Sequence, residues 1–264
     1  MRLGLMSDVH GNRIALEAVI ADGVQQGVDA WWVLGDLVAI GTEPVATLEL
    51  LADLPGVRFV RGNTDRYVMT GARPSPHRPD VERDPALQGL FDAIEASSSW
   101  TRAHVERDWS QMLSALPNAQ RIVLDDGTRL LGVHASPGSD DGPGITPEIA
   151  DDELERLLRG SEADIVCGGH THQATNRRVG GMQTVNLGSV SNPMTSDLGA
   201  TYVVVEYDRH GHRVGHRRVT YDHDAVVERC VRSDHPEAAY IASFQRGEHA
   251  RYAADRPGAP DFDT

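Results

Sequence analysis

The chain contains no lysine, so all 25 of its basic residues are arginine. Lysine forms Schiff bases with carbonyl substrates and is the phosphate-binding cation of Walker-type nucleotide sites, so both chemistries are excluded. Cysteine is almost as scarce, with Cys167 and Cys230 alone. Because their separation matches no metal-ligand spacing, we expect both to be reduced residues of the core or of a helix.

Long apolar runs are also absent, and the longest falls far short of the roughly 20 residues that span a bilayer. The N-terminus passes from one arginine straight into an apolar run and shows no signal-peptide pattern, so we expect a cytoplasmic protein without a membrane partner. The net charge of −14 disfavours binding to extended nucleic acid. A small phosphate-ester substrate stays possible, because bound metal ions can supply local positive charge.

What the chain does contain is an alternation of short apolar runs and helical patterns. Its 264 residues, 40% hydrophobic and 24% charged, fit one globular α/β domain or two small ones. The patterns predict strands at residues 3–6, 30–34 and 57–60 and helices at residues 12–28 and 44–54. This order predicts β-α-β units, whose right-handed crossovers bring the ends of parallel strands together.

Polar side chains follow each of these strands. Asp8 and His10 come after the first strand, Asp36 follows Gly35 after the second, and Asn63 follows Gly62 after the third. Open α/β sheets place their chemistry at this edge of the sheet. We therefore expect these side chains to share one site.

Residues 71–120 interrupt the alternation and predict a helical insertion, with helices at 87–94 and 100–116. A hairpin (121–124 and 129–133) then ends in His134, a helix is predicted at 149–158, and a strand at 164–167 precedes His170 and His172. The spans 183–186, 200–207 and 213–220 predict consecutive antiparallel strands. Helices at 225–232 and 237–246 and a disordered tail at 251–264 complete the prediction.

Seven residues at predicted strand ends are metal-ligating types. They are Asp8, His10, Asp36, Asn63, His134, His170 and His172. Carboxylate, amide and imidazole ligands suit first-row divalent ions, and seven of them suit two ions, with Asp36 as the natural bridge.

The same residues stand in sequence blocks that resemble a known family. The blocks Asp8-Val9-His10, Gly35-Asp36, Gly62-Asn63-x-Asp65, Gly132-Val133-His134 and Gly169-His170-Thr171-His172 resemble, in order and rough spacing, those of the calcineurin-like metallophosphoesterases. The similarity runs from residue 3 to about residue 207 and includes the segment 185–189. It is greatest to the small bacterial and archaeal phosphodiesterases of that family.

The resemblance implies an α+β fold, a four-layer αββα sandwich of two mixed β-sheets flanked by helices. Residues 1–250 would form a single domain, with the helical insertion at about 71–120 and C-terminal helices at about 225–246. A first divalent ion would be held by Asp8, His10, Asp36 and His172, and a second by Asp36, Asn63, His134 and His170. Manganese is the expected metal, with iron, nickel and zinc as alternatives.

Two such ions, typically about 3.5–4 Å apart, clamp a phosphoryl group and share a water that loses its proton and attacks phosphorus in line. In this scheme Asp36, Asn63 and His134 act in catalysis through the ions. Asn12 and Asp65 lie beside ligands in the sequence, and each is either a residue that orients a ligand or an ordinary cap or turn residue.

One position departs from the family pattern. Many members have histidine directly after the asparagine of the third block, where this chain has Thr64. A threonine hydroxyl is a poor acid at neutral pH, which disfavours alkyl phosphomonoesters and favours a phosphodiesterase. The alternatives are a phosphatase acting on a nucleotide or a phosphoprotein, and a non-catalytic metal-binding scaffold that binds a protein.

Overall fold

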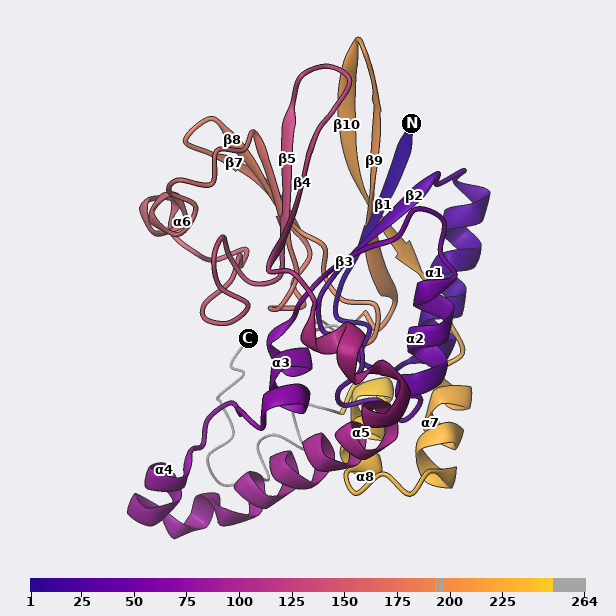
Figure 1. The fold of residues 1–264 in the computed structure, drawn as a ribbon, viewed down its shortest axis with the longest axis vertical. Helices are drawn as coiled ribbons and strands as arrows, with labels where there is room; N and C mark the ends of the chain where they lie inside the picture. The colour runs from indigo at the N-terminus through magenta and orange to yellow at the C-terminus, as the bar shows by residue number, and fades with distance from the viewer. Residues whose placement is uncertain (193, 195–196, 249–264) are drawn as a thin grey trace.

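The computed structural model describes residues 1–192, 194 and 197–248. Two β-sheets lie face to face, and helices cover their outer sides (Figure 1). The predicted tail at 251–264 falls outside the described residues.

The first sheet has the order β10-β9-β1-β2-β3 and joins both halves of the chain. Its strands are β1 (Arg2–Met6), β2 (Ala30–Leu34), β3 (Arg58–Val60), β9 (Ala200–Asp208) and β10 (Gly211–Val219). β1, β2 and β3 run parallel, whereas β9 pairs antiparallel with both β1 and β10. The sheet is therefore mixed, as the family resemblance implied.

The second sheet has the order β4-β5-β6-β8-β7 and lies within the middle of the chain. Its strands are β4 (Ala119–Val123), β5 (Arg129–Val133), β6 (Ile165–Gly168), β7 (Thr175–Val179) and β8 (Met182–Asn186). β5, β6 and β8 are parallel, and β4 and β7 run antiparallel to their neighbours at the two edges.

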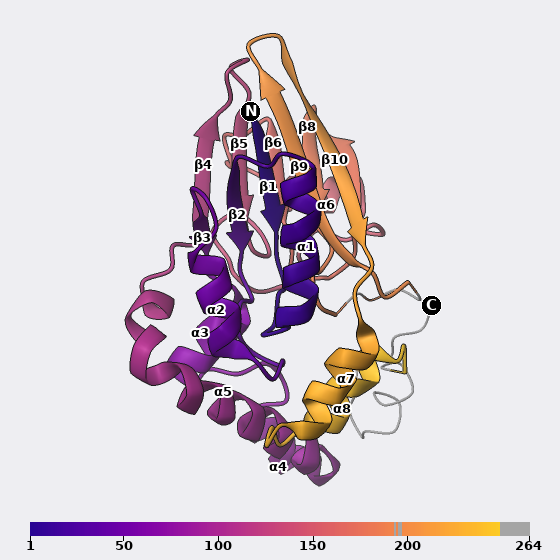
Figure 2. The ribbon, with the colours of Figure 1, turned by 90° about the vertical axis from the view of Figure 1, so that its right-hand side faces the viewer.

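Three apolar layers hold these sheets and helices together. Alternate residues of β1, such as Leu3 and Leu5, pack between the sheets against Ile165 and other residues of the second sheet. The outer face of the first sheet packs on α1 (Arg13–Gln25) and α2 (Pro44–Ala52), as Figure 2 shows, and residues of α5 (Gln88–Ser114) extend the same apolar cluster. The outer face of the second sheet packs on α6 (Asp151–Leu157). The four-layer arrangement is confirmed.

The interruption at residues 71–120 is helical, but its division differs from the prediction. Instead of separate helices at 87–94 and 100–116, a single helix, α5, runs through both spans. The polar stretch between them, Ala96 to Ser99, is helical because a long helix with packed neighbours tolerates weak helix formers. α3 (Asn63–Thr70) and α4 (Arg78–Arg83) were not predicted. α5 lies beyond the ends of β1–β3 in both views (Figures 1 and 2).

The predicted pairing of strands 183–186 and 200–207 is wrong. β8 and β9 belong to different sheets, and β8 instead pairs with β6 and with the unpredicted strand β7. Alternation of side chains identifies a strand but says nothing of its partner, and the long connection after β8 crosses from one sheet to the other.

The two cysteines and the last helices lie where the sequence predicted them. Cys167 is buried in β6 and Cys230 is buried in α7 (His223–Arg232), and both thiols are free. α8 (Ala238–Gln245) packs against α7. Among the helices of the described residues, none combines the length and apolarity needed to cross a bilayer.

Candidate metal centre

The seven predicted ligands converge at one end of the two facing sheets. Asp8, His10, Asp36 and Asn63 come from the first sheet's loops and His134, His170 and His172 from the second sheet's. The first four and His134 are buried, and His170 and His172 are half-buried. Each of the two sheets thus supplies part of one polar cluster.

Backbone strain is concentrated at these positions. Among the described residues, seven that are not glycine have a positive φ, and five of them are predicted ligands: Asp8, His10, Asp36, His170 and His172. This left-handed region is unfavourable for side chains with a Cβ and persists where surrounding contacts enforce it, which is common at functional sites. The strand-end loops therefore turn sharply to direct these side chains toward one another.

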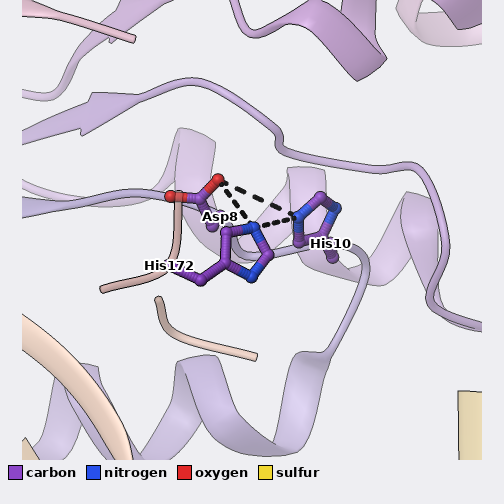
Figure 3. Close-up of side chains that lie close together, drawn as sticks. All are labelled: Asp8, His10 and His172. Atoms are coloured by element: carbon purple, nitrogen blue, oxygen red, sulfur yellow. Dashed lines mark hydrogen bonds and ion pairs between the residues drawn. The ribbon is translucent and has the colours of Figure 1, made fainter. Parts of the chain in front are cut away.

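Asp8, His10 and His172 form the first group (Figure 3). The Nε2 atoms of His10 and His172 lie 3.2 Å apart, and Asp8 Oδ1 lies 3.2 Å from His172 Nε2 and 3.9 Å from His10 Nε2. Three potential ligand atoms thus face one small volume.

Asn63, His134 and His170 form the second group. Asn63 Oδ1 lies 2.9 Å from His134 Nε2 and 3.1 Å from His170 Nδ1. Asp36 lies between the groups, with Oδ2 3.7 Å from His10 Nε2 and Oδ1 3.4 Å from His134 Nε2. Asp8 also comes within ligand distance of Asp36 and His134, so the two groups are contiguous.

Each of the four histidines has its second ring nitrogen against a main-chain carbonyl. These contacts are His10 Nδ1 to Ala39 O at 3.1 Å, His134 Nδ1 to Leu34 O at 2.7 Å, His170 Nε2 to Gly142 O at 2.8 Å and His172 Nδ1 to Asn192 O at 2.5 Å. A carbonyl only accepts, so this nitrogen donates its proton, and each ring, when neutral, turns the lone pair of its other nitrogen toward the cluster. This is the arrangement of a metal-binding histidine.

The convergence of lone pairs fits divalent cations. Without a proton or a cation, Nε2 of His10 would face Nε2 of His172, and Nε2 of His134 would face Asn63 Oδ1, acceptor against acceptor. A bound cation satisfies all of these atoms together with the carboxylates of Asp8 and Asp36. The donor set therefore fits the divalent metals that the sequence implied.

Burial and the neighbouring charges shift the pKa values of the side chains in the cluster. Burial opposes ionisation of Asp8 and Asp36, but the facing imidazoles outweigh it and lower the pKa of both carboxyl groups. Burial lowers the pKa of His10 to about 4. His134 differs, because the Asp36 carboxylate overcomes burial and raises its pKa to about 10. A metal ion held by His134 would take the place of that proton.

A family model, the calcineurin-like phosphoesterase superfamily domain, matches residues 1–210, which include every residue of this cluster. The chain belongs to this superfamily. It is therefore a phosphoesterase by family, and its Asp and His cluster lies where the family's metal-binding blocks were predicted.

Three similar proteins span nearly the whole phosphoesterase. An uncharacterized protein of Methanocaldococcus jannaschii is 24% identical over 253 residues, 89% of this chain and 94% of its own. The crystal structure of a metallophosphoesterase from Sphaerobacter thermophilus is 26% identical with a TM-score of 0.69, covering 94% of this chain and 99% of its own. A hypothetical protein from Pyrococcus horikoshii OT3 shares the fold, with a TM-score of 0.75 at 20% identity over 92% of this chain and 97% of its own.

Asp65 locks together two of the phosphoesterase's ligand loops. Its fully buried carboxylate accepts main-chain N–H groups from Asp36, Leu37 and Gly62 at 2.9–3.0 Å. Burial and the neighbouring Asp36 charge raise the pKa of Asp65 to about 7, against these donors, which lower it. Asp65 thus fixes the main chain at Asp36 and at Gly62, which agrees with the first of the two roles considered from the sequence.

The side chains of Asn12 and Thr64, unlike that of Asp65, do not join two of the ligand loops. Asn12 caps α1, accepting the Ala15 N–H and donating to Ser191, so its side chain is a helix cap. Thr64 donates its main-chain N–H to Asp36 Oδ1 at 3.0 Å, whereas its buried hydroxyl has no hydrogen-bond partner. The hydroxyl thus supplies no proton relay among the described residues.

Glycines beside the ligands are required by close approach. A Cβ on Gly62 would lie 2.0 Å from Asp36 Oδ1 and 2.2 Å from Asp36 N, and one on Gly169 would lie 2.4 Å from Asp8 Oδ2. We expect Gly62→Ala to displace Asp36, to destabilise the fold by about 2 kcal/mol and to weaken metal binding about tenfold or more. Calorimetric titration with Mn²⁺ and urea unfolding measure the two effects. Gly215→Ala, where the new Cβ meets nothing and φ is likewise not positive, controls for the loss of a glycine alone.

The sequence did not predict which residues support the loops and the helix that carry the cluster. Asn186 donates to the carbonyls of Ile145 and Gly169 and thereby fixes the loop that carries His170 and His172. Tyr67 lies one helical turn after Asn63, a spacing that becomes informative only once residues 63–70 are known to be a helix.

Proposed function

We propose that the protein is a dinuclear-metal-dependent phosphodiesterase that hydrolyses a small phosphate diester. The observation that carries the proposal is the pair of adjoining ligand groups with Asp36 between them, one oxygen toward each. Bound ions in such a pair activate a water and neutralise charge on the phosphoryl oxygens. We assign Asp8, His10, Asp36 and His172 to one ion and Asp36, Asn63, His134 and His170 to the other.

Thr64 supports the choice of a diester. A buried hydroxyl without a partner has no route for proton supply to a leaving group. Diesters with acidic leaving groups depart with little protonation and are the substrates least affected by this absence. The net charge of −14 further favours a small substrate over extended nucleic acid.

A chromogenic diester and its monoester, bis(4-nitrophenyl) phosphate and 4-nitrophenyl phosphate, test the proposal directly. Chelator-stripped protein should be inactive and should regain diester hydrolysis with Mn²⁺, Fe²⁺, Ni²⁺ or Zn²⁺. We expect manganese to be effective because the ligand set mixes nitrogen with oxygen. Turnover that favours the monoester would instead support a phosphatase of nucleotides or phosphoproteins. Binding of two ions without turnover of either substrate would support a scaffold.

Thr64→His is expected to raise monoester hydrolysis about 100-fold and to leave diester hydrolysis within a few-fold. The physical reason is that an imidazole at this position can protonate a poor leaving group, which the threonine hydroxyl cannot. Steady-state kinetics on bis(4-nitrophenyl) phosphate and on glycerol 2-phosphate, an alkyl monoester whose leaving group needs a proton, measure the change, and Thr64→Asn, polar but not an acid, is the control. Only a trivial rise in monoesterase activity would show that a missing acid is not what sets the preference.

We also propose that residues 1–250 act as one domain, with residues 71–120 and the C-terminal helices as additions to its core. Val105 and Leu113 of α5 share an apolar cluster with Leu16 of α1 and Leu48 of α2. α7 and α8 pack against Ile14 and Ile40 beside the ligand loops. In the part of the chain that the structure describes, both additions therefore pack against the sandwich.

A further inference from the structure

The segment Asp140–Gly142, in the connection between β5 and α6, lies against the helix that carries Asn63. Asp140 is buried and accepts Arg61 Nε at 2.8 Å and Arg66 Nη2 at 2.9 Å. Arg61 and Arg66 stand on either side of Asn63 in the chain. The Asp140 carboxylate thus holds the start of α3 from both sides.

Asp141 extends this contact toward the cluster. Its Oδ2 accepts the Tyr67 hydroxyl in a short hydrogen bond and Arg66 Nη2 at 3.2 Å. Tyr67 lies one turn of α3 after Asn63, and the nearby Asn63 side chain opposes burial and the Asp141 carboxylate, which raise the pKa of the Tyr67 hydroxyl to about 12. Since Asn63 directs Oδ1 at His134 and His170, its amide nitrogen is the end that faces Tyr67.

Gly142 completes the arrangement on the other side. Its carbonyl accepts His170 Nε2 at 2.8 Å, which leaves Nδ1 of His170 as the nitrogen beside Asn63. Its φ of +104° is a conformation that favours glycine. Neighbouring residues of one loop therefore fix the orientation of Asn63, through Tyr67, and of His170 directly.

We propose that Asp141 and Tyr67 are positioning residues for one metal ion of the pair, the one held by Asn63, His134 and His170. This inference rests on the proposed dinuclear site. His10 and His172, assigned to the other ion, are oriented by the carbonyls of Ala39 and Asn192, outside this segment. Loss of the contacts that lead from Asp141 through Tyr67 to Asn63 should therefore weaken the binding of one ion more than that of the other.

Calorimetric titration of metal-free full-length protein with Mn²⁺ alone tests this selectivity. Tyr67→Phe and Asp141→Ala should each weaken one binding event about tenfold or more and leave the other within twofold. At an Mn²⁺ concentration between the two affinities, the electron paramagnetic resonance spectrum of the variants should be that of isolated Mn²⁺, where the wild type shows a coupled pair. Asp141 is partly exposed, so its variant folds even if Tyr67→Phe does not.

Tyr202→Phe is the matched control, because it also removes a buried tyrosine hydroxyl that donates to an aspartate, Asp22, at 2.6 Å. It should leave both binding events unchanged. Equal weakening of both events in the variants, or no weakening of either, would overturn the positioning role and leave the dinuclear function standing. A wild-type chain that binds only one ion would overturn both proposals.

Discussion

Asp36→Ala is expected to bind neither metal ion and to lose at least about 10³-fold in kcat/KM. Asp36 directs one carboxylate oxygen toward His10 and the other toward His134, so its removal takes a ligand from both groups at once. Metal ions contribute several kcal/mol of transition-state stabilisation, and each 1.4 kcal/mol corresponds to a factor of ten in rate. The variant should also show no rise in melting temperature on addition of Mn²⁺, since bound metal stabilises only a chain that holds it.

Metal content by mass spectrometry, together with diester kinetics and thermal unfolding, measures these effects. Asp126→Ala is a suitable control, because Asp126 also faces a histidine, His212, at 2.7 Å but lies in the β4–β5 turn. It should retain metal and activity. Two ions per chain in Asp36→Ala would disprove the bridging assignment.

Asp65→Ala should destabilise the protein by about 4 kcal/mol even without metal. The substitution leaves the N–H groups of Asp36, Leu37 and Gly62 buried without their acceptor. Each unsatisfied buried group costs about 1–3 kcal/mol, and relaxation of the loops recovers part of the total. For a chain of this size the loss corresponds to a fall of roughly 10 °C in melting temperature.

Urea unfolding of metal-free protein measures the free-energy change. Asp65→Asn retains one acceptor oxygen and should fall between the wild type and the alanine variant. Asp84→Ala, which removes a single exposed acceptor of the Ala86 N–H, should cost under about 1 kcal/mol. A loss for Asp65→Ala no larger than that of Asp84→Ala would contradict the locking role.

The clustering of the seven residues could be predicted from the sequence because each follows a strand whose apolar pattern is local. The strand before Asp36, for example, is a run of apolar residues that ends at Gly35. Parallel strands of such a sheet end at the same edge. The position of each residue at a strand end was therefore sufficient to predict that residues of one sheet lie close together. The family blocks then supplied the division of ligands between two ions.

The sequence could not predict which strands pair or which contacts support the cluster. Residues 183–186 and 200–207 are adjacent strands in the chain but belong to different sheets, and their side-chain pattern is the same for either pairing. The carbonyls of Ala39 and Asn192 orient histidines through main-chain atoms that every residue carries. α3 was not predicted, because it begins at Asn63 in a polar sequence that is typical of a turn.

The pairing of β1 with β9 has a consequence for folding of the chain. The two strands lie nearly 200 residues apart in the sequence, and the whole second sheet comes in between. Closing a loop of that length delays the central contact of the first sheet, because distant contacts form late in folding. During folding, β1 therefore keeps one edge unpaired until β9 has reached it.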